Sequence, residues 1–521
     1  MKASNPHPTV WEWIYAILLG LAGAWIVLAA TSVYGAGVSS DSMFYISSAD
    51  NFAAGTGFFD FKGDPLTDFP PLYSLILGML KWASGKTPFV WGRFLNAAGI
   101  AALIVSTGQL LIHCFPGRRL WFYLGTLATL LFLPLYTLAA NISTDVLYIL
   151  FSLWFCLAAG YFLETRSPLW LAALGFLAAC SAMLRWIGLA FVVTGAILVL
   201  LAYRDQKKKA LLYAGLFAVI TALPLVLWTG MRNFLVYGTL GRAGVNLGLV
   251  DVVENLKLSV YHILAWTSPD PVLYCLPLLV PLILLVVILN RKMDWLRWIR
   301  RLFSNPILPV ILLTAVYFVA VHLTGYTGDH LQPFDDRYQA PLYFCLLVIL
   351  FSALDELVFA HLSGRLSQLA TLLVILVVGM WGVYKMSSLI QFIRVSQAQG
   401  VVEYNDYNTK KMQRSPVIIY LLENPPEPGA VLYSNEPEAL YFYLRRPVEM
   451  SPTDPGSLYP VPEKLPLLYS DWPPEGKAYL VWIKPSEKRH YYKPEALAQL
   501  ASLEKLYKQW DGEIYLLTPK D

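Results

Sequence analysis

Long apolar runs recur through most of the chain, from Trp11 to about Ser388, and only short polar breaks separate them. A helix of about 20 apolar residues spans the hydrocarbon core of a bilayer, where the backbone must satisfy its own hydrogen bonds. Hydrophobic residues make up 57% of the 521 residues and charged residues only 14%, which excludes an ordinary soluble enzyme. We therefore expect a mainly α-helical, multi-pass membrane protein.

The apolar runs predict about eleven transmembrane helices. The expected spans lie near residues 11–31, 90–113, 119–138, 145–163, 168–184, 187–203, 210–230, 271–290, 306–324, 339–359 and 367–388. The stretch 72–83 is too short to span and follows Pro70-Pro71, so we expect an interfacial or re-entrant helix there. The first run is too long and too aromatic for a signal peptide, and we expect it to remain as the first helix.

The distribution of Lys and Arg predicts the orientation of these helices, because cytoplasmic loops carry an excess of basic residues. With the N-terminus in the cytoplasm, the cytoplasmic loops contain most of the clustered basic residues: Arg118, Arg119, Arg166, Arg204, Lys207, Lys208, Lys209, Arg291, Lys292, Arg297, Arg300, Arg301 and Arg365. An odd number of crossings then places the C-terminal region outside the cytoplasm. The membrane itself is expected to be the inner (plasma) membrane. The segment "KMDWLRWIRR" predicts a surface helix that contacts membrane lipids. The net charge of +4, spread over many loops, indicates no nucleic-acid partner.

The composition changes at about residue 391 to a Pro-rich, charged, mixed sequence. In it "AVLYSN" and "AYLVWI" predict short buried strands, "EPEALYFYL" and "PEALAQLASLEKL" predict amphipathic helices, and "KLYKQWDGEIYLL" predicts a hairpin that turns at Asp511-Gly512. Residues 391–521 are therefore expected to form a small extracytoplasmic α/β domain. It contains no recognisable chemical motif, and we expect a structural cap or a cap that recognises an acceptor.

Polar residues gather at the predicted outer ends of the helices, whereas mid-span positions are nearly all apolar. They include Asp41 in the first outer loop, Asn141 to Asp145 in the second, Arg185 at a tight turn, Arg232-Asn233, and the segment "GYTGDHLQPFDDRYQAP". A transporter is instead expected to have charges or broken helices near the middle of the membrane. The outer loops could converge on one outward-facing cavity that suits a substrate with an apolar tail and a polar head.

Several short motifs in a fixed order carry a resemblance to a known family. They are D-x-x-x-Y from Asp41 to Tyr45, then "ADNFAAGTGF", P-P-L-Y, R-F-L-N, R-N-F-x-x-Y-G and a late R-Y-x-x-P. Their order and sidedness resemble the GT-C superfamily of membrane glycosyltransferases, and within it the bacterial branch related to protein O-mannosyltransferases and lipid A aminoarabinose transferase. The resemblance implies a transmembrane glycosyltransferase domain over residues 1–390, with a catalytic first outer loop at about 32–85.

The resemblance also implies a chemistry. In such enzymes a sugar linked to polyprenyl phosphate is transferred outside the cytoplasm, usually with inversion at the anomeric carbon. The acceptor is a glycan, a lipid or a protein. The position that matches the family's catalytic acid is Asp41, although relatives commonly have a second acid directly after it, where this chain has Ser42.

Asp41 is our candidate general base, because an ionised carboxylate near the acceptor can take the proton that the nucleophile releases. The alternative role for Asp41 is a helix N-cap, since "SSDSMFYI" also starts a surface helix well. Asp145 resembles a second acid of the family; it could orient the acceptor or help to hold a divalent cation such as Mg²⁺ or Mn²⁺ through its oxygens. A helix N-cap is again its alternative role. Other cofactors are not expected.

Arginine binds phosphate through a planar fork and stays charged when it is partly desolvated. We expect Arg337 and Arg232 to bind the donor phosphate, followed by Arg93 and Arg185; each could instead be an interfacial charge or an ion-pair partner. Tyr45, His330 and Tyr338 are candidates for contacts with donor or acceptor. The competing functions are a transporter or flippase of a lipid-linked glycan, and a non-catalytic membrane scaffold.

Overall fold

The computed structural model describes residues 8–240, 252–266, 295–324, 336–401, 403, 407–454, 460–473, 476–484 and 490–520. The chain divides into two compact units. The first contains residues 1–30, 67–73 and 92–394, and the second contains residues 31–66, 74–91 and 395–521. The membrane-spanning candidates are mostly in the first unit, while most of residues 32–85 and the C-terminal sheet are in the second.

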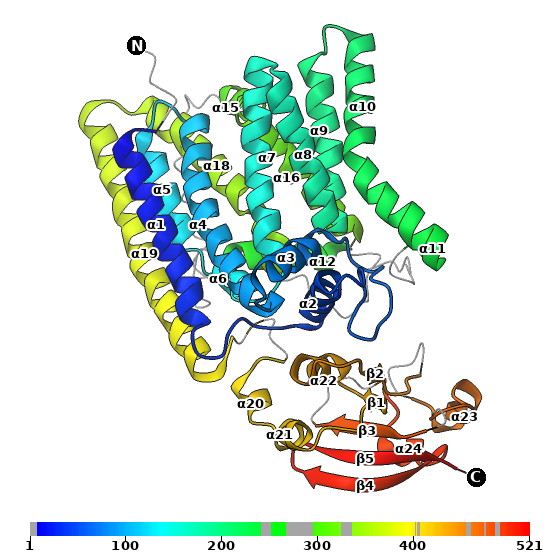
Figure 1. The fold of residues 1–521 in the computed structure, drawn as a ribbon. Coiled ribbons are helices and arrows are strands. Elements are labelled where there is room, and N and C mark those ends of the chain that lie inside the picture. The colour runs from blue at the N-terminus through cyan, green and yellow to red at the C-terminus, as the bar shows by residue number, and fades with distance from the viewer. Residues whose placement is uncertain are drawn as a thin grey trace. The chain divides into compact units, whose positions relative to one another are not determined.

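The first unit is a bundle of apolar helices (Figure 1). Six helical stretches among the described residues are long and apolar enough to cross a membrane: α1 (Val10–Ala30), α4 (Pro88–Cys114), α7 (Asp145–Thr165), α10 with η2 and α11 (Lys207–Tyr237), α17 to η4 (Asp336–Val358) and α19 (Gly364–Gln399). A seventh is the pair α5 (Arg119–Leu130) and α6 (Leu133–Ala139), bent by 47°. The shorter apolar helices are α8 (Pro168–Leu184), α9 (Leu189–Ala202) and α16 (Leu308–Thr324).

These helices confirm the prediction of a mainly helical protein with several apolar spans. Each predicted span that falls within the described residues coincides with a helix, and the short stretch after Pro70-Pro71 forms α3 (Leu72–Ser84). The predicted span at 271–290 lies outside the described residues. The number of eleven crossings and the orientation of the termini remain predictions.

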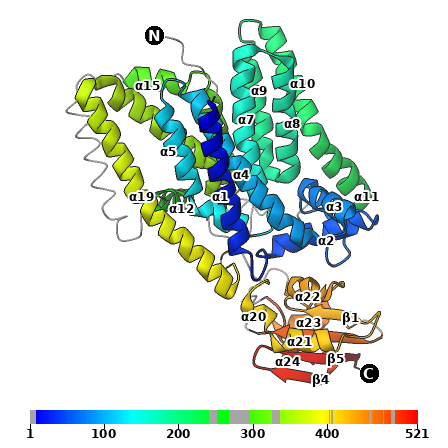
Figure 2. The same ribbon diagram turned by 60° about the vertical axis from the view of Figure 1, so that its left-hand side comes forward.

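Helix α7 lies in the interior of the bundle. Of the membrane-crossing window of α7, 78% is buried inside the protein, compared with only 6% for α19. Figures 1 and 2 both show α7 beside α8 and α9, and its buried residues include Tyr148 and Phe155, whose neighbour Phe191 comes from α9. A helix buried on nearly all sides is a rigid support for a site at its end.

Ion pairs join several elements near the C-terminal end of the Asp336–Val358 span. There Asp355 pairs with the guanidinium groups of Arg118 and Arg301, and Arg301 also contacts Glu356 at 2.5 Å. Arg301 belongs to α15 (Trp295–Leu302), the helix predicted from "KMDWLRWIRR". These pairs attach α15 to the bundle.

The second unit contains a five-stranded sheet in the order β2-β1-β3-β5-β4. Strands β1 (Val431–Ser434), β2 (Glu449–Met450) and β3 (Ala478–Ile483) are parallel, and β4 (Ala501–Gln509) and β5 (Gly512–Pro519) form the antiparallel hairpin predicted around Asp511-Gly512. The predicted strands "AVLYSN" and "AYLVWI" are confirmed as β1 and β3. The predicted helix "PEALAQLASLEKL" is wrong beyond its first turn, because α24 (Pro494–Leu497) ends and β4 begins at Ala501.

Helices cover both faces of this sheet. Along β3 the buried side chains alternate between two clusters: Leu480 packs with Leu465, Trp472 and Leu517, while Val481 packs with Leu421, Leu440 and Ile514. The first cluster receives side chains from α23 (Leu465–Leu468) and α24, and the second from α21 (Pro416–Glu423) and α22 (Pro437–Leu444). The C-terminal region is thus a three-layer α/β/α domain with two small cores.

Helix α2 (Ser40–Ala53) carries the predicted catalytic position and belongs to the second unit. Its N-cap is Ser39, whose hydroxyl accepts a hydrogen bond from the backbone N–H of Ser42, while the Ser42 hydroxyl accepts one from the N–H of Ser39. This reciprocal capping box satisfies two backbone donors and fixes where the helix begins. Asp41 is therefore in the first turn of α2, and the expectation that it could be the N-cap is wrong.

Candidate functional site

Asp145 is the most buried carboxylate among the predicted site residues, and it begins α7. Asp145 is only 2% exposed. Both of its carboxylate oxygens contact positively charged side chains. Oδ1 contacts a terminal nitrogen of Arg185, and Oδ2 accepts a hydrogen bond from Nε of Arg337 at 3.0 Å. These three side chains together carry one negative and two positive charges, a net charge of +1. Thr144 precedes Asp145 as the N-cap, so the N-cap alternative for Asp145 is also wrong.

The turn that presents Arg185 is unusually close-packed. Arg185 has an extended backbone between α8 and the short helix η1 (Trp186–Gly188), and a Cβ on Gly188 would lie 2.0 Å from the carbonyl oxygen of Ser181. Only glycine allows this approach of two backbone segments. The indole N–H of Trp186 donates to the carbonyl oxygen of Asp68 at 2.9 Å, which fixes the turn from its other side.

A short helix, α17 (Asp336–Gln339), presents Arg337, and α12 (Val252–Ala265) and Trp266 support it. The indole N–H of Trp266 donates to Oδ1 of Asp336 at 2.8 Å, and Nδ1 of His262 lies 3.4 Å from the same oxygen. One turn earlier on α12, the Ser259 hydroxyl accepts a hydrogen bond from the Gln339 amide at 3.0 Å. Arg337 therefore lies between Asp336 and Gln339, two residues that contact Trp266 and α12.

Two tyrosine rings and several hydroxyl groups lie near Arg185 and Asp145. The Arg185 guanidinium lies 5.8 Å from the ring centre of Tyr148, and the Tyr317 ring lies 6.0 Å from that of Tyr148. The Tyr317 hydroxyl donates to the carbonyl oxygen of Tyr338 at 2.9 Å. The buried hydroxyls of Ser143, Thr144 and Tyr148 have no hydrogen-bond partner among the described residues. Such groups occur at sites that bind a polar molecule, because an unpaired buried hydroxyl is costly.

The cluster has the chemistry of an anion site. The side chains of Arg185 and Arg337 are 18% and 19% exposed, so they are partly desolvated but reachable. A guanidinium has five N–H donors in a planar fork, so one that pairs with a carboxylate can bind a second anion as well. Asp145 thus pairs with two arginines at once, and the net positive charge of these three side chains favours a phosphate.

No group of three or more His, Cys, Asp or Glu side chains that could hold a metal ion occurs in the part of the chain that the structure describes. Both Asp145 oxygens contact guanidinium groups, so the described surroundings of Asp145 do not fit a divalent cation. Metal dependence remains a prediction.

The other predicted arginines have different partners. Arg232 stacks on Trp228, with 4.0 Å from its guanidinium to the ring centre, and donates to the side-chain oxygen of Asn233 at 2.7 Å. Asn233 in turn donates to the carbonyl oxygen of Thr67 at 3.3 Å. Arg93 donates to the carbonyl oxygen of Leu28 near the end of α1, at 2.7 Å. Their roles as phosphate ligands remain predictions.

The remaining predicted residues are distributed as follows. Asp41 is partly exposed in the first turn of α2, and Tyr45, one turn later, is buried at 3% exposure. His330 lies outside the described residues. The predicted meeting of Asp41 with the arginines remains a prediction. Sequence reasoning missed Tyr148 and Tyr317; the three-residue spacing from Asp145 to Tyr148 indicates one helix face, whereas nothing in the apolar run around Tyr317 marks it.

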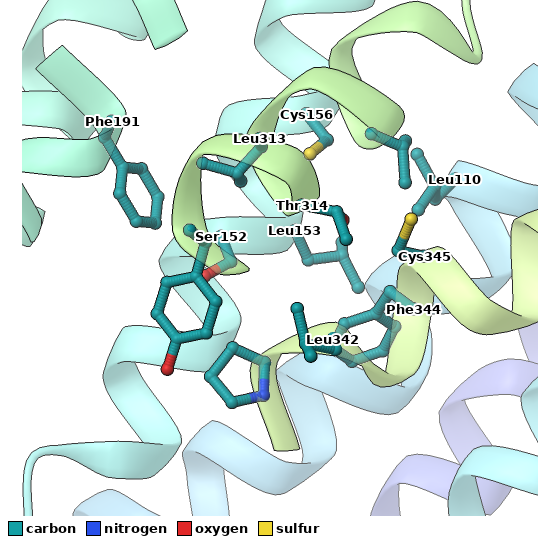
Figure 3. A pocket seen from close by; sticks show the side chains of 13 residues that line it. Leu110, Ser152, Leu153, Cys156, Phe191, Leu313, Thr314, Leu342, Phe344 and Cys345 are labelled. Atoms are coloured by element: carbon teal, nitrogen blue, oxygen red, sulfur yellow. The ribbon is translucent and has the colours of Figure 1, made fainter. Parts of the chain in front are cut away.

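An apolar pocket lies between α4, α7, α9, α16 and α18 (Tyr343–Ala353) (Figure 3). Figure 3 shows the sulfur atoms of Cys156 and Cys345 and the ring of Phe344 at its wall, and Tyr317 also lines it. Its volume of about 20 Å³ is enough for about one water molecule. The pocket is therefore too small for an isoprenoid chain, and the charged cluster around Asp145 is the candidate site.

The structure resembles the crystal structure of ArnT from Cupriavidus metallidurans in the apo state, with a TM-score of 0.58, 14% identity, and coverage of 96% of this chain and 97% of ArnT. It also resembles the crystal structure of the same protein bound to undecaprenyl phosphate, with a TM-score of 0.58, 14% identity and 98% coverage of each chain. The cryo-EM structure of the arabinosyltransferase EmbB from Mycobacterium smegmatis gives a TM-score of 0.35 at 13% identity, over 74% of this chain and 41% of EmbB.

No protein-family model matches the sequence, and a search of curated proteins finds no significant match. The likeness to ArnT extends over nearly the whole of both chains and shows a shared fold. The GT-C resemblance drawn from the sequence motifs is thereby confirmed at the level of the fold.

Proposed function

We propose that this chain is a membrane glycosyltransferase that moves a sugar from a polyprenyl-phosphate-linked donor to an acceptor at the outer face of the membrane. The observation that carries the proposal is the Asp145 cluster, in which one buried carboxylate aligns Arg185 and Arg337. The fold supports it, because ArnT shares that fold and has been crystallised with undecaprenyl phosphate bound.

The two arginines would bind the phosphate that links the sugar to the polyprenyl chain. When the bond from the anomeric carbon to the phosphate oxygen breaks, negative charge develops on that oxygen. Cationic groups held in place before the reaction stabilise such charge without reorganising. A phosphate is also a weak base, so neutralising its charge matters more than protonating it. This role needs arginines that stay charged when desolvated.

Asp41 would be the general base. The acceptor hydroxyl or amine gives its proton to the Asp41 carboxylate, its oxygen or nitrogen bonds to the anomeric carbon, and the electron pair of the breaking bond leaves with the phosphate. Attack from the face opposite the phosphate inverts the anomeric carbon. Tyr45, one turn after Asp41 on α2, and Tyr338 would contact donor or acceptor. The sugar is a hexose or a pentose, and the acceptor is a glycan, a lipid or a protein.

The rival functions predict a different outcome when Asp41 is changed. A flippase or transporter of a lipid-linked glycan, or a scaffold, needs no base at this position. The experiment uses the purified full chain and a panel of undecaprenyl-phosphate-linked hexoses and pentoses, and it measures release of undecaprenyl phosphate in the presence of lipid, glycan and peptide acceptors. We expect release with at least one donor, and its loss by a factor of about 100 or more in Asp41→Asn.

Binding of undecaprenyl phosphate provides the control for this experiment. Asp41→Asn should bind it as the unchanged chain does, because the phosphate ligands are intact. Release that is the same in Asp41→Asn and in the unchanged chain would exclude Asp41 as the base. No release with any donor, together with movement of a lipid-linked glycan across vesicle membranes, would favour the flippase.

A further inference from the structure

The C-terminal domain holds the segment that carries Asp41 at several points along its length. Before α2, the Asn408 amide donates to the carbonyl oxygens of Tyr34 and Ala36 at 2.6 and 2.7 Å, and the Tyr407 N–H donates to the carbonyl oxygen of Val38 at 3.1 Å. All of these residues belong to the second compact unit.

A contact at the residue before Asp41 joins α2 to α22. Ser40, the residue directly before Asp41, donates its hydroxyl hydrogen to Oε1 of Glu438 at 3.0 Å. Glu438 is in the first turn of α22, whose position is fixed by Leu440 in the core of the sheet. A hydrogen bond to a charged acceptor is about twice as strong as a neutral one.

The far end of α2 has a second connection to the same helix of the domain. Asp50 pairs with Lys81 of α3 at 2.7 Å, and its other oxygen lies 3.9 Å from Arg445, the C-cap of α22. Between these ends, Phe44 of α2 packs on Phe61, with 5.2 Å between the ring centres, and Phe61 lies 6.1 Å from Tyr441 of α22.

We infer that Glu438 is a positioning residue for the transfer reaction, through which the C-terminal domain fixes the first turn of α2 and therefore the direction of the Asp41 carboxylate. The inference rests on the proposed function, because it gives Asp41 the role of base. It gives the C-terminal domain, which has no recognisable chemical motif, a role in the reaction. A base must be held within a few tenths of an ångström of its productive position, and a misplacement of about 1 Å costs up to about 100-fold in rate.

The capping box explains why this contact affects position more than stability. Ser39 and Ser42 satisfy the first backbone donors of α2 by themselves, so the helix forms without Glu438. Loss of the Ser40–Glu438 hydrogen bond is therefore expected to free the helix start to move without unfolding it. Since the arginines proposed as phosphate ligands are unchanged in these variants, the affinity for the donor phosphate should not change.

The test compares Glu438→Ala, Glu438→Gln and Ser40→Ala in the full chain. A matched control is Glu427→Ala, which removes a carboxylate of the same domain that pairs with Lys477 at 2.5 Å on the surface. Each variant is assayed for kcat and KM with the undecaprenyl-phosphate-linked donor found active above. The amount of undecaprenyl phosphate bound per chain measures the folded fraction, and hydrogen exchange follows the backbone amides of α2.

We expect Glu438→Ala and Ser40→Ala to lower kcat by about 10-fold, with donor KM and lipid stoichiometry unchanged and with faster exchange in the first turn of α2. Glu438→Gln keeps an acceptor oxygen and should stay within about two-fold of the unchanged chain. The double variant Ser40→Ala/Glu438→Ala should be no slower than either single variant, because both remove one interaction. Glu427→Ala should change nothing.

Two results would overturn the inference. One is an unchanged kcat and an unchanged exchange rate in Glu438→Ala while Asp41→Asn is inactive, which leaves the proposed function intact and removes the positioning role alone. The other is a fall in kcat that follows the folded fraction, or that Glu438→Gln does not rescue, which would make Glu438 a residue of the domain's stability only. Full activity of Asp41→Asn would instead exclude Asp41 as the base, and the inference, which gives Asp41 that role, would fall with it.

Discussion

Asp145 and Arg337 are 192 residues apart in the sequence, and the structure joins them through a 3.0 Å hydrogen bond from Nε to Oδ2. The other oxygen of Asp145 contacts Arg185, so a carboxylate at the start of α7 holds guanidinium groups from two later segments. Opposite charges that are buried together support one another, and removing one of them leaves the others uncompensated.

Replacing Asp145 by Asn should therefore do two things. It should lower the free energy of unfolding by about 3 kcal/mol, since two partly buried arginines lose their counter-charge. It should also weaken the binding of undecaprenyl phosphate by about 10-fold or more, because the guanidinium groups are no longer aligned. Thermal unfolding and lipid binding of the full chain measure the two effects.

Asp355 provides a matched control for this variant. It too pairs with two arginines, Arg118 and Arg301, but at the other end of the Asp336–Val358 span. Asp355→Asn should destabilise the chain without changing lipid affinity per folded molecule. Equal losses of lipid affinity in both variants would show that Asp145 acts only through stability.

Changing Arg337 to Lys should separate charge from geometry. Lysine keeps the positive charge but loses the planar fork that can bind a carboxylate and a phosphate together. We expect affinity for undecaprenyl phosphate to fall by about 10-fold, and by more in Arg337→Ala. The control is Arg301→Lys, which should leave the affinity as it is. Tight binding by Arg337→Lys would show that only a point charge is needed.

The turn at Gly188 allows a test of whether the backbone there positions Arg185. A methyl group on Gly188 meets the carbonyl oxygen of Ser181, so Gly188→Ala should displace the turn and move Arg185 from Asp145. We expect destabilisation of about 1–3 kcal/mol and weaker lipid binding. Gly215→Ala is the control, because a Cβ there has no atom within 4 Å and should be neutral or stabilising. Unchanged lipid binding in Gly188→Ala would contradict a role for this turn.

The buried carboxyl group of Asp60 should make the free energy of unfolding depend on pH. It is 6% exposed, and burial raises its pKa to about 6 against the opposing effects of Lys62 and of two backbone N–H groups. A carboxyl whose pKa is higher in the folded state binds its proton more tightly there, so stability should fall as the pH rises from about 4 to about 6. Two pKa units correspond to at most about 3 kcal/mol.

Asp60→Asn isolates this contribution. Asn keeps an oxygen that can accept from the N–H groups of Lys62 and Asp64, at the positions where Asp60 accepts at 2.9 and 3.0 Å, but it does not titrate. The difference in unfolding temperature between the variant and the unchanged chain should increase in favour of the variant from pH 4 to pH 7. A difference that stays constant over this range would show that Asp60 keeps its ordinary pKa.

Hydrophobic runs were sufficient to predict the apolar spans that the structure describes in the first unit, because a span must be long and apolar whatever its neighbours are. They did not predict α12, which is less apolar and supports Arg337. The segment "PEALAQLASLEKL" shows where such local reasoning fails. Its apolar spacing fits a helix, yet residues from Ala501 pair with β5, so tertiary pairing decides the structure there. The capping of α2 also depends on which of several adjacent polar residues turns toward the backbone, and Ser39 does so in place of Asp41.

The candidate site was predictable as a set of residues but not as a set of contacts. Asp145, Arg185 and Arg337 each follow from polar positions at predicted outer helix ends. Their pairing depends on how α7, α8 and α17 pack, which no local pattern encodes. The hydrogen bond from Ser40 to Glu438 joins residues that are 398 positions apart in the sequence. It depends on the fold of the C-terminal domain.

The most direct test of the account is a structure of the full chain with undecaprenyl phosphate bound. We expect the phosphate oxygens to contact the guanidinium groups of both Arg185 and Arg337 while Asp145 still pairs with them. A phosphate held by other residues, with Arg185 and Arg337 contacting only Asp145, would contradict it.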